Sequence, residues 1–364
     1  MTTKSMHAIL VLEDGKIFKG KSFGATGERF GEAVFNTSIT GYQEIITDPS
    51  YKFQIVTMTY PLIGNYGVNE EDVESKKPWL SAFVIKELSS ISSNWRSTMA
   101  LDEYLKKHDI PGIQGIDTRA LTRHLRLQGA MQAVVSTEDF DTSRLIKKIK
   151  ASQHLEGVDL VKDVTCDKAY DWNKKGKYKV IVLDCGVKFN ILRNLEKAGC
   201  KVVVMPAAVQ PKEILDAKPD GLLFSNGPGD PAAVKYVIKT AQELVGKLPI
   251  FGICLGHQML GLALGAKTYK LKFGHHGGNH PVKDLNTGKV AITSQNHGFN
   301  VDMNTMPDKG TVATHLNLYD NTVEGMENSK LKFFSVQYHP EAGPGPHDAG
   351  YLFEKFVKMM EKNA

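Results

Sequence analysis

One cysteine stands where this sequence could place a nucleophile. Cys254 follows an apolar run, residues 249–253, that is typical of a buried strand, and the residues after it are typical of a helix. Gly252 and Gly256 flank the cysteine, so the chain can bend tightly and project the thiol outward at the head of the helix. The positive end of the helix dipole favours a thiolate there. We therefore expect Cys254 to attack an acyl carbon, since a merely buried cysteine would leave both glycines unexplained.

A histidine and a carboxylate near the C-terminus could supply the base. His339 and Glu341 are separated by Pro340, which biases the residue before it toward extended backbone. Side chains two residues apart in an extended chain point the same way, so both can project to one side. A carboxylate placed there fixes the tautomer of the imidazole and stabilises its charged form. A surface pair is the alternative, but beside a cysteine turn we expect a catalytic triad of Cys254, His339 and Glu341.

Three further segments could line a substrate pocket. The loop 225–231 carries glycine N–H groups that could stabilise an oxyanion together with the N–H of Leu255, although a plain turn is the alternative. It lacks the Gly-Lys-Ser/Thr of a phosphate-binding loop. Gln258 lies one helical turn beyond Cys254 on the same face, which suggests a substrate contact. The segment 295–299 is interpreted as a polar loop that could cap the pocket or be only a loop.

The histidine-rich stretch 273–281 is the remaining candidate for a ligand site. No carboxylate or cysteine lies there at the spacing of metal ligands, and its glycines favour a shaped loop, so we expect no metal. The cysteines lie far apart, which argues against a disulfide framework or a zinc site and fits a reducing compartment. They are Cys166, Cys185, Cys200 and Cys254.

A two-domain chain of mixed α/β class must position these residues. Residues 1–150 mix short β-type and helical segments and predict an α+β domain, and 151–179 are interpreted as a polar connector. From residue 180 to 364, uniformly apolar strands first alternate with helices, which predicts a mostly parallel sheet covered on both faces. Sites in such sheets form at the carboxyl ends of strands, where the loop 225–231 and Cys254 both fall.

The composition limits the other classes of function. With 41% hydrophobic and 23% charged residues, the chain is typical of a globular protein. The formal net charge is +5, but the charges are interspersed and no basic run contains aromatic residues, so nucleic-acid binding has no support. The N-terminal residues 1–17 include no long apolar run, which predicts neither a signal peptide nor a membrane span. We expect a cytoplasmic protein.

Two motifs together resemble those of the class I (triad) glutamine amidotransferases, namely residues 252–258 and 339–341. Other segments, most of them in the N-terminal half, are similar to the small-subunit family of carbamoyl-phosphate synthetase, and this resemblance covers essentially the whole chain. These segments are 35–44, 47–51, 60–65, 115–119, 272–281 and 344–347.

The resemblance implies a flavodoxin-like amidotransferase domain behind a small-subunit domain, and a glutaminase reaction. Cys254 would attack the side-chain amide carbon of glutamine to form a γ-glutamyl thioester, while His339 carries protons and Glu341 orients it. Ser50 would place part of the glutamine pocket in the N-terminal domain, and Gly229 and Leu255 would supply the oxyanion hole. The residues implied to hold glutamine are Ser50, Gly227, Gly229, Leu255, Gln258, Asn296, Gly298 and Phe299.

The resemblance also implies a partner. Ammonia would pass through a tunnel to a large subunit, which uses bicarbonate, two molecules of ATP and Mg to make carbamoyl phosphate for arginine and pyrimidine biosynthesis. This chain would need no cofactor of its own, and the two subunits would form a heterodimer or a higher oligomer of heterodimers. Two alternatives remain. One is an amidotransferase subunit for another acceptor, as in anthranilate or GMP synthesis, against which the N-terminal motifs argue. The other is a non-catalytic binding module, against which the intact triad argues.

Overall fold

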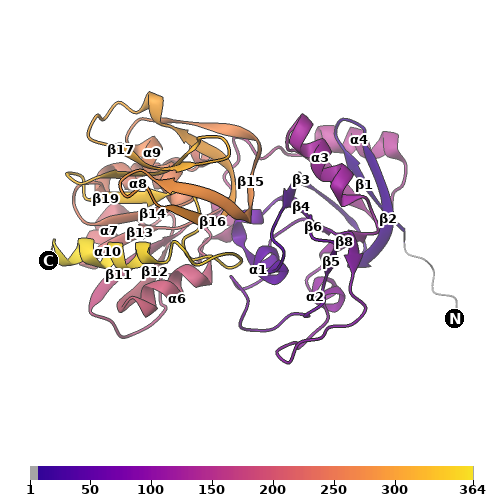
Figure 1. Cartoon of the computed structure of the whole chain (residues 1–364), viewed down its shortest axis with the longest axis horizontal. Coiled ribbons are helices and arrows are strands. Elements are labelled where there is room, and N and C mark those ends of the chain that lie inside the picture. Colours follow the sequence, from indigo (N-terminus) through magenta and orange to yellow (C-terminus); the bar gives the residue numbers. More distant parts are fainter. Residues whose placement is uncertain (1–6, 364) are drawn as a thin grey trace. The chain divides into compact units, whose positions relative to one another are not determined.

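The computed structural model describes residues 7–363, which fall into two compact units. The first comprises Met1–Leu155 with Lys272–His276, and the second comprises Glu156–Leu271 with Gly277–Ala364. In Figure 1 the first unit is mostly indigo to magenta and the second mostly pink to yellow. No helix of the described chain combines the length and apolar character needed to cross a membrane.

The first unit is built on a closed barrel with the strand order β1-β2-β8-β6-β4-β3-β9. The neighbours β3 and β4, β4 and β6, and β6 and β8 are parallel, and the other pairs are antiparallel. The barrel strands are β1 (His7–Leu12), β2 (Ile17–Gly24), β3 (Glu28–Asn36), β4 (Gln54–Met58), β6 (Ala82–Val84), β8 (Pro111–Gln114) and β9 (Met131–Ser136).

Short helices and one small strand pair pack around this barrel. Helix α3 begins where the Asp117 side chain accepts a hydrogen bond from the N–H of Ala120, and it ends at Gly129, whose φ is 112°. The other elements of this unit are α1 (Tyr42–Thr47), the 3-10 turn η1 (Pro49–Tyr51), β5 (Leu62–Ile63), β7 (Glu87–Leu88), α2 (Leu101–Lys107), α3 (Thr118–Gln128) and α4 (Thr142–Ala151).

The second unit is a ten-stranded sheet with the order β10-β12-β11-β13-β14-β19-β18-β17-β15-β16. Its central strands β12, β11, β13, β14 and β19 are all parallel, which confirms the predicted mostly parallel sheet. The strands are β10 (Tyr170–Asp171), β11 (Tyr178–Asp184), β12 (Cys200–Pro206), β13 (Gly221–Phe224), β14 (Ile250–Ile253), β15 (Lys267–Asp284), β16 (Val290–Asp302), β17 (Val312–Asn317), β18 (Val323–Asn328) and β19 (Phe333–Val336).

Helices bury both faces of the parallel strands. Within β11, Val180 and Val182 pack toward α6 and α10, whereas Ile181 and Leu183 pack toward α7, α8 and α9. Figure 1 shows α6 and α10 close to β11 and β12. Strands covered on both faces need no polar side, which is why their sequences are continuously apolar. The helical elements are α5 (Val161–Val164), α6 (Phe189–Lys197), α7 (Pro211–Asp216), η2 (Pro231–Ala233), α8 (Lys235–Leu244), α9 (Leu255–Ala263), η3 (Met303–Thr305) and α10 (Tyr351–Glu361).

Three segments differ from the sequence interpretation. The expected connector 151–179 contributes helix α5 and strand β10, which pairs with β12 at the sheet edge. The expected loops 273–281 and 295–299 lie inside the long strands β15 and β16. Strand pairing uses backbone groups, so runs of glycine, histidine and asparagine can form strands although their side chains give no apolar alternation.

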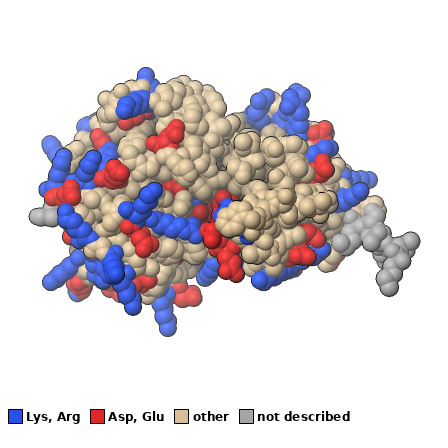
Figure 2. All heavy atoms as spheres, turned by 60° about the horizontal axis from the view of Figure 1, so that its bottom comes forward, with Lys and Arg blue, Asp and Glu red and all other residues tan. Residues whose placement is uncertain are grey.

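The charged surface is mixed. Over the face drawn in Figure 2, lysine and arginine side chains are intermixed with aspartate and glutamate. On this face the mixture agrees with the interspersed charges of the sequence.

A close approach between α9 and β13 sets the position of the helix that follows Cys254. A Cβ atom on Gly256 would lie 2.2 Å from the carbonyl oxygen of Phe224 on β13. The N–H of Gly256 also donates to the carbonyl of Ser225, at 3.1 Å. Glycine is therefore required at this position because the two backbones are in contact.

We expect Gly256→Ala to lower the free energy of unfolding by about 1–3 kcal/mol, because α9 must move away from β13. Urea unfolding measures this loss. Gly350→Ala is the matched control, since Gly350 has φ −56° and a Cβ there would make only an ordinary contact, 3.4 Å from the carbonyl of His347. Equal stability of the Gly256→Ala variant and the parent would contradict the close packing.

Candidate active site

The turn predicted at Cys254 is present, and its backbone is strained. Cys254 joins β14 to α9 with φ 54° and ψ −104°, a conformation that non-glycine residues rarely adopt. Its N–H donates to the carbonyl of Val336 on the neighbouring strand β19, at 2.8 Å. Cys254 stands at the head of α9 as predicted, and only 2% of the residue is exposed. The strained turn points the sulfur into a covered polar environment.

Polar groups from β16 and from the segment after β19 surround the sulfur. Cys254 Sγ lies 3.6 Å from the carbonyl oxygen of Asn296, and Gln337 Nε2 lies 3.7 Å from the same sulfur. The Gln258 amide donates to Gln337 Oε1 at 3.1 Å and to the carbonyl of Phe299 at 2.8 Å. Gln258 therefore ties the helix after the cysteine to both segments, and Gln337 is a neighbour of the sulfur to which the sequence interpretation gave no role.

His339 and Glu341 project to one side as predicted. His339 Nδ1 lies 2.7 Å from Glu341 Oε1, and both side chains are almost completely buried. The His339 N–H donates to the carbonyl of Ser294 on β16, at 2.9 Å. The other ring nitrogen, Nε2, is buried and makes no hydrogen bond within the described residues. The carboxylate thus orients the ring and leaves Nε2 able to exchange a proton.

A buried lysine completes the charge chain, and the sequence interpretation missed it. Lys188 Nζ lies 3.1 Å from Glu341 Oε1, and only 2% of the lysine side chain is exposed. Lys188 is the residue before α6, and its N–H donates to the Asn226 side chain at 3.1 Å. The sequence does contain a feature that indicates a role for Lys188. This lysine follows the carboxyl end of β11, and Cys254 likewise follows the carboxyl end of a parallel strand.

The charges in this chain stabilise one another. Burial by itself would raise the pKa of Glu341, but Lys188 and His339 lower it below its ordinary value. Burial would likewise lower the pKa of His339, yet the Glu341 carboxylate and Cys254 raise it above the ordinary value. The arrangement therefore favours a charged imidazole between a carboxylate and the sulfur.

A nearby histidine is unsuited to be the base. His257 lies on α9, and its Nδ1 is 2.9 Å from Ser335 Oγ. Burial, with a smaller contribution from His315, lowers the pKa of His257 to about 3. His257 is thus neutral near pH 7 and connects α9 to β19.

The remaining predicted residues occupy the following positions. Gly227 is packed so closely that an added Cβ would lie 2.1 Å from the Cys185 carbonyl and 2.8 Å from a Leu255 methyl, so this loop abuts the head of α9. Gly229, two residues further on, has φ 88°. Gly298 lies on β16 with open space where a Cβ would project. Ser50 lies in η1 of the first unit, and its part in the pocket stays a prediction.

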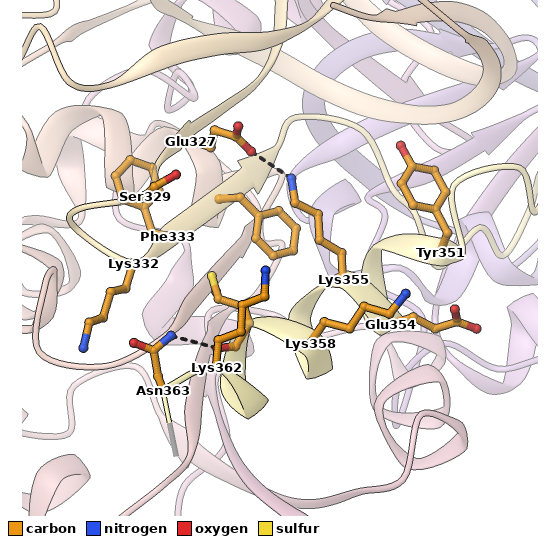
Figure 3. A pocket seen from close by; sticks show the side chains of 12 residues that line it. Glu327, Ser329, Lys332, Phe333, Tyr351, Glu354, Lys355, Lys358, Lys362 and Asn363 are labelled. Carbon is orange, nitrogen blue, oxygen red and sulfur yellow. Dashed lines mark hydrogen bonds and ion pairs between the residues drawn. The ribbon is translucent and has the colours of Figure 1, made fainter. Parts of the chain in front are cut away.

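A hollow elsewhere on the second unit is a poor candidate for the glutamine site. It encloses about 600 Å³ and contains no residue of the predicted triad or glutamine set. Figure 3 shows lysines of α10 along it, with Lys355 paired to Glu327 at 2.8 Å. Its lining residues include Lys332, Phe333, Phe334, Tyr351, Lys358, Met359 and Lys362.

The fold and the covered cysteine define the class of protein. Residues 181–359 match the class-I glutamine amidotransferase family, and residues 10–135 match the small-chain domain of carbamoyl-phosphate synthase. The second unit is accordingly a class I glutamine amidotransferase domain.

The family of the whole chain follows from its relatives. The chain is 56% identical to the carbamoyl phosphate synthase small chain of Syntrophotalea carbinolica, over 98% of this chain and 99% of that protein. It is 55% identical to the small chain of Chlorobaculum tepidum, over 99% of each chain. The chloroplastic small chain of Oryza sativa is 52% identical, over 99% of this chain and 83% of that protein. The chain belongs to the carbamoyl phosphate synthase small chain family.

We expect Lys188→Met to lower the free energy of unfolding at pH 7 by about 3 kcal/mol, because Glu341 loses a buried counterion while His339 remains beside it. Without the lysine, the pKa of Glu341 rises, so the loss shrinks as the pH is lowered toward 5 and the carboxyl takes up a proton. Urea unfolding at both pH values measures this. The double variant Lys188→Met/Glu341→Gln removes the stranded charge and should recover part of the loss. No recovery would mean that Lys188 acts by packing alone.

We expect Glu341→Gln to lower the pKa of His339 and to slow glutamine hydrolysis about a hundredfold or more. Because the folded pKa of His339 is raised above 6.5, its contribution to stability is present below that pH and is lost as the pH rises through the raised value. The variant should lose this contribution. NMR titration of the His339 ring measures the shift, and an unchanged midpoint would contradict the role of Glu341.

Proposed function

We propose that this chain is the glutaminase subunit of glutamine-hydrolysing carbamoyl-phosphate synthase. The observation that carries the proposal is the buried charge chain from Lys188 through Glu341 to His339, in the same domain as a strained cysteine turn. A structural core does not require three buried ionisable side chains that contact one another. Nucleophilic catalysis by a thiol does require an imidazole held in a fixed orientation near the sulfur.

The first half of the reaction acylates the enzyme. The Cys254 thiolate attacks the side-chain amide carbon of glutamine, and the carbonyl oxygen becomes an oxyanion that the N–H groups of Gly229 and Leu255 stabilise. The tetrahedral intermediate collapses, the carbon–nitrogen bond breaks, and His339 Nε2 donates a proton to the departing nitrogen, which leaves as ammonia. A γ-glutamyl thioester remains on Cys254, and the neutral His339 is held in position by Glu341.

The second half releases glutamate. His339 takes a proton from water, whose oxygen attacks the thioester carbon, and the carbon–sulfur bond breaks. The cysteine leaves as a thiolate and the imidazole is again charged, so the site returns to its first state. Glutamine would be held by residues that precede Cys254 in the chain and by residues that follow it. These are Gly227, Gly229, Leu255, Gln258, Asn296, Gly298 and Phe299, with Ser50 of the first unit as the resemblance implies.

The ammonia is used by a partner. The family name implies a larger chain, and we propose that it receives the ammonia and carries ATP and Mg, the two chains forming a heterodimer or an oligomer of heterodimers. This chain needs no cofactor for the hydrolysis itself. We also propose a cytoplasmic location, which the unpaired state of all its cysteines supports.

We expect Cys254→Ser to abolish glutamate release from glutamine, because the serine hydroxyl is a far weaker nucleophile than a thiolate. In the complex with the large chain, carbamoyl phosphate synthesis from added ammonia should continue at the parent rate. Coupled assays of glutamate and carbamoyl phosphate, with glutamine or ammonium as nitrogen source, measure both activities.

Other outcomes would each reject a specific part of this proposal. Retained glutaminase activity in Cys254→Ser would mean that the nucleophile is misassigned. A parent chain that releases no glutamate with a competent large chain would favour a non-catalytic binding module. Glutamine hydrolysis coupled only to an anthranilate or GMP synthase would indicate another acceptor.

A further inference from the structure

Glu324 is a buried carboxylate of the second unit that the proposed reaction does not use. It lies on β18, and its exposed fraction is 0%. Its Oε2 accepts a hydrogen bond from the Gln295 amide and its Oε1 accepts one from the Asn317 amide, both at 3.0 Å. One carboxylate therefore joins β18 to β16 and to β17. Because burying a carboxylate is costly and a hydrophobic side chain could fill the same space, its presence points to a role beyond packing.

The carboxylate sets the direction in which the Gln295 amide faces. A carboxylate only accepts hydrogen bonds, so Gln295 must turn its NH₂ group toward Glu324 and its carbonyl oxygen away from it. That oxygen, Gln295 Oε1, lies 2.9 Å from His297 Nε2. The other ring nitrogen, His297 Nδ1, lies 2.8 Å from the carbonyl oxygen of Phe299. The imidazole is thus held at both nitrogens, and the series of contacts that begins at Glu324 ends at the backbone of Phe299.

The segment 295–299 that these contacts hold lies beside the sulfur. Within it, the Asn296 carbonyl oxygen is 3.6 Å from Cys254 Sγ. Glu324 also holds the second neighbour of the sulfur, because its backbone carbonyl accepts from the N–H of Gln337 at 2.9 Å. Gln337 Nε2 in turn lies 3.7 Å from Cys254 Sγ. Glu324 therefore supports both groups that contact the sulfur, without contacting it itself.

Side chains make this connection because the sheet does not. In the strand order of the described chain, β17 and β15 lie between β16 and β18, so these two strands share no neighbouring ladder. The Asn300 amide, which donates to the carbonyl of Val323 at 3.1 Å, is a second side-chain link between them. The position of segment 295–299 against β18 thus depends on a few polar side chains, among which Glu324 makes the contact to Gln295.

We propose that Glu324 is a positioning residue for glutamine hydrolysis, which acts through Gln295 and His297 to hold segment 295–299 in the conformation that receives glutamine. The inference rests on the proposed function, which assigns Asn296 and Phe299 to the glutamine pocket. It adds a residue that fixes the groups of that pocket from behind, through hydrogen bonds to their neighbours.

We expect Glu324→Leu to raise the KM for glutamine about tenfold or more and to lower kcat by less than about threefold, because segment 295–299 loses its support while the triad keeps its contacts. Steady-state glutamate release by the full chain, in complex with the large chain, measures both constants. A merely structural role would reduce the folded fraction, which lowers the apparent kcat and leaves KM unchanged. Glu324→Gln keeps an oxygen that can accept from Gln295, so its KM should lie between those of the parent and Glu324→Leu.

Two further variants make the test specific. Glu327→Gln is the matched control, because Glu327 lies on the same strand but its carboxylate pairs with Lys355 at 2.8 Å, in the hollow of Figure 3. It should keep the KM and kcat of the parent. The double variant Glu324→Leu/Gln295→Leu tests the route of the effect. Since Glu324 acts through Gln295, its KM should be close to that of either single variant and well below the product of the two effects.

The contrary results are distinct. A parent-like KM in Glu324→Leu, with or without a fall in kcat, would overturn the positioning role while leaving the proposed function intact. If Glu324→Leu does not fold, Glu324→Gln decides, and an unchanged KM there would overturn the role in the same way. Effects on KM that multiply in the double variant would refute the route through Gln295. A parent chain that releases no glutamate even with a competent large chain would refute the proposed function, and this inference with it.

Discussion

The buried charges of Lys188, Glu341 and His339 constrain how the second unit can fold. Each of them would be costly to desolvate alone, and together they are stable only if their distances are held near hydrogen-bond length. The three residues come from different places in the chain, one before α6 and two after β19. The parallel sheet brings those places to one edge, so its central strand order is a requirement of the chemistry as well as of the packing.

The same edge explains why the nucleophile is covered. The cysteine turn lies where β14 ends, with β13 on one side and β19 on the other, and glycines allow the backbones to approach closely. Gln258 then ties α9 to β16 and to Gln337, which lies against the sulfur. A sulfur among fixed carbonyl and amide dipoles is protected from bulk solvent, and the groups around it need little rearrangement when charge develops.

The two units differ in which groups they contain. The second unit contains every group that the proposed hydrolysis uses for bond making and proton transfer. The first unit holds its apolar residues in a closed barrel. The lysine-lined hollow beside α10 has no part in this scheme.

What the sequence by itself determined was local. The glycines around Cys254 predicted the turn, the spacing of His339 and Glu341 predicted their shared side, and continuous apolar strands predicted the parallel sheet, because each depends on neighbouring residues. The tertiary structure alone revealed the pairing of Lys188 with Glu341, the covering of the sulfur by Asn296 and Gln337, and the strands formed by 273–281. These depend on contacts between residues distant in the chain, whose side chains carry no periodic signal. Closure of the barrel was likewise decided by packing, since it does not follow from residue type.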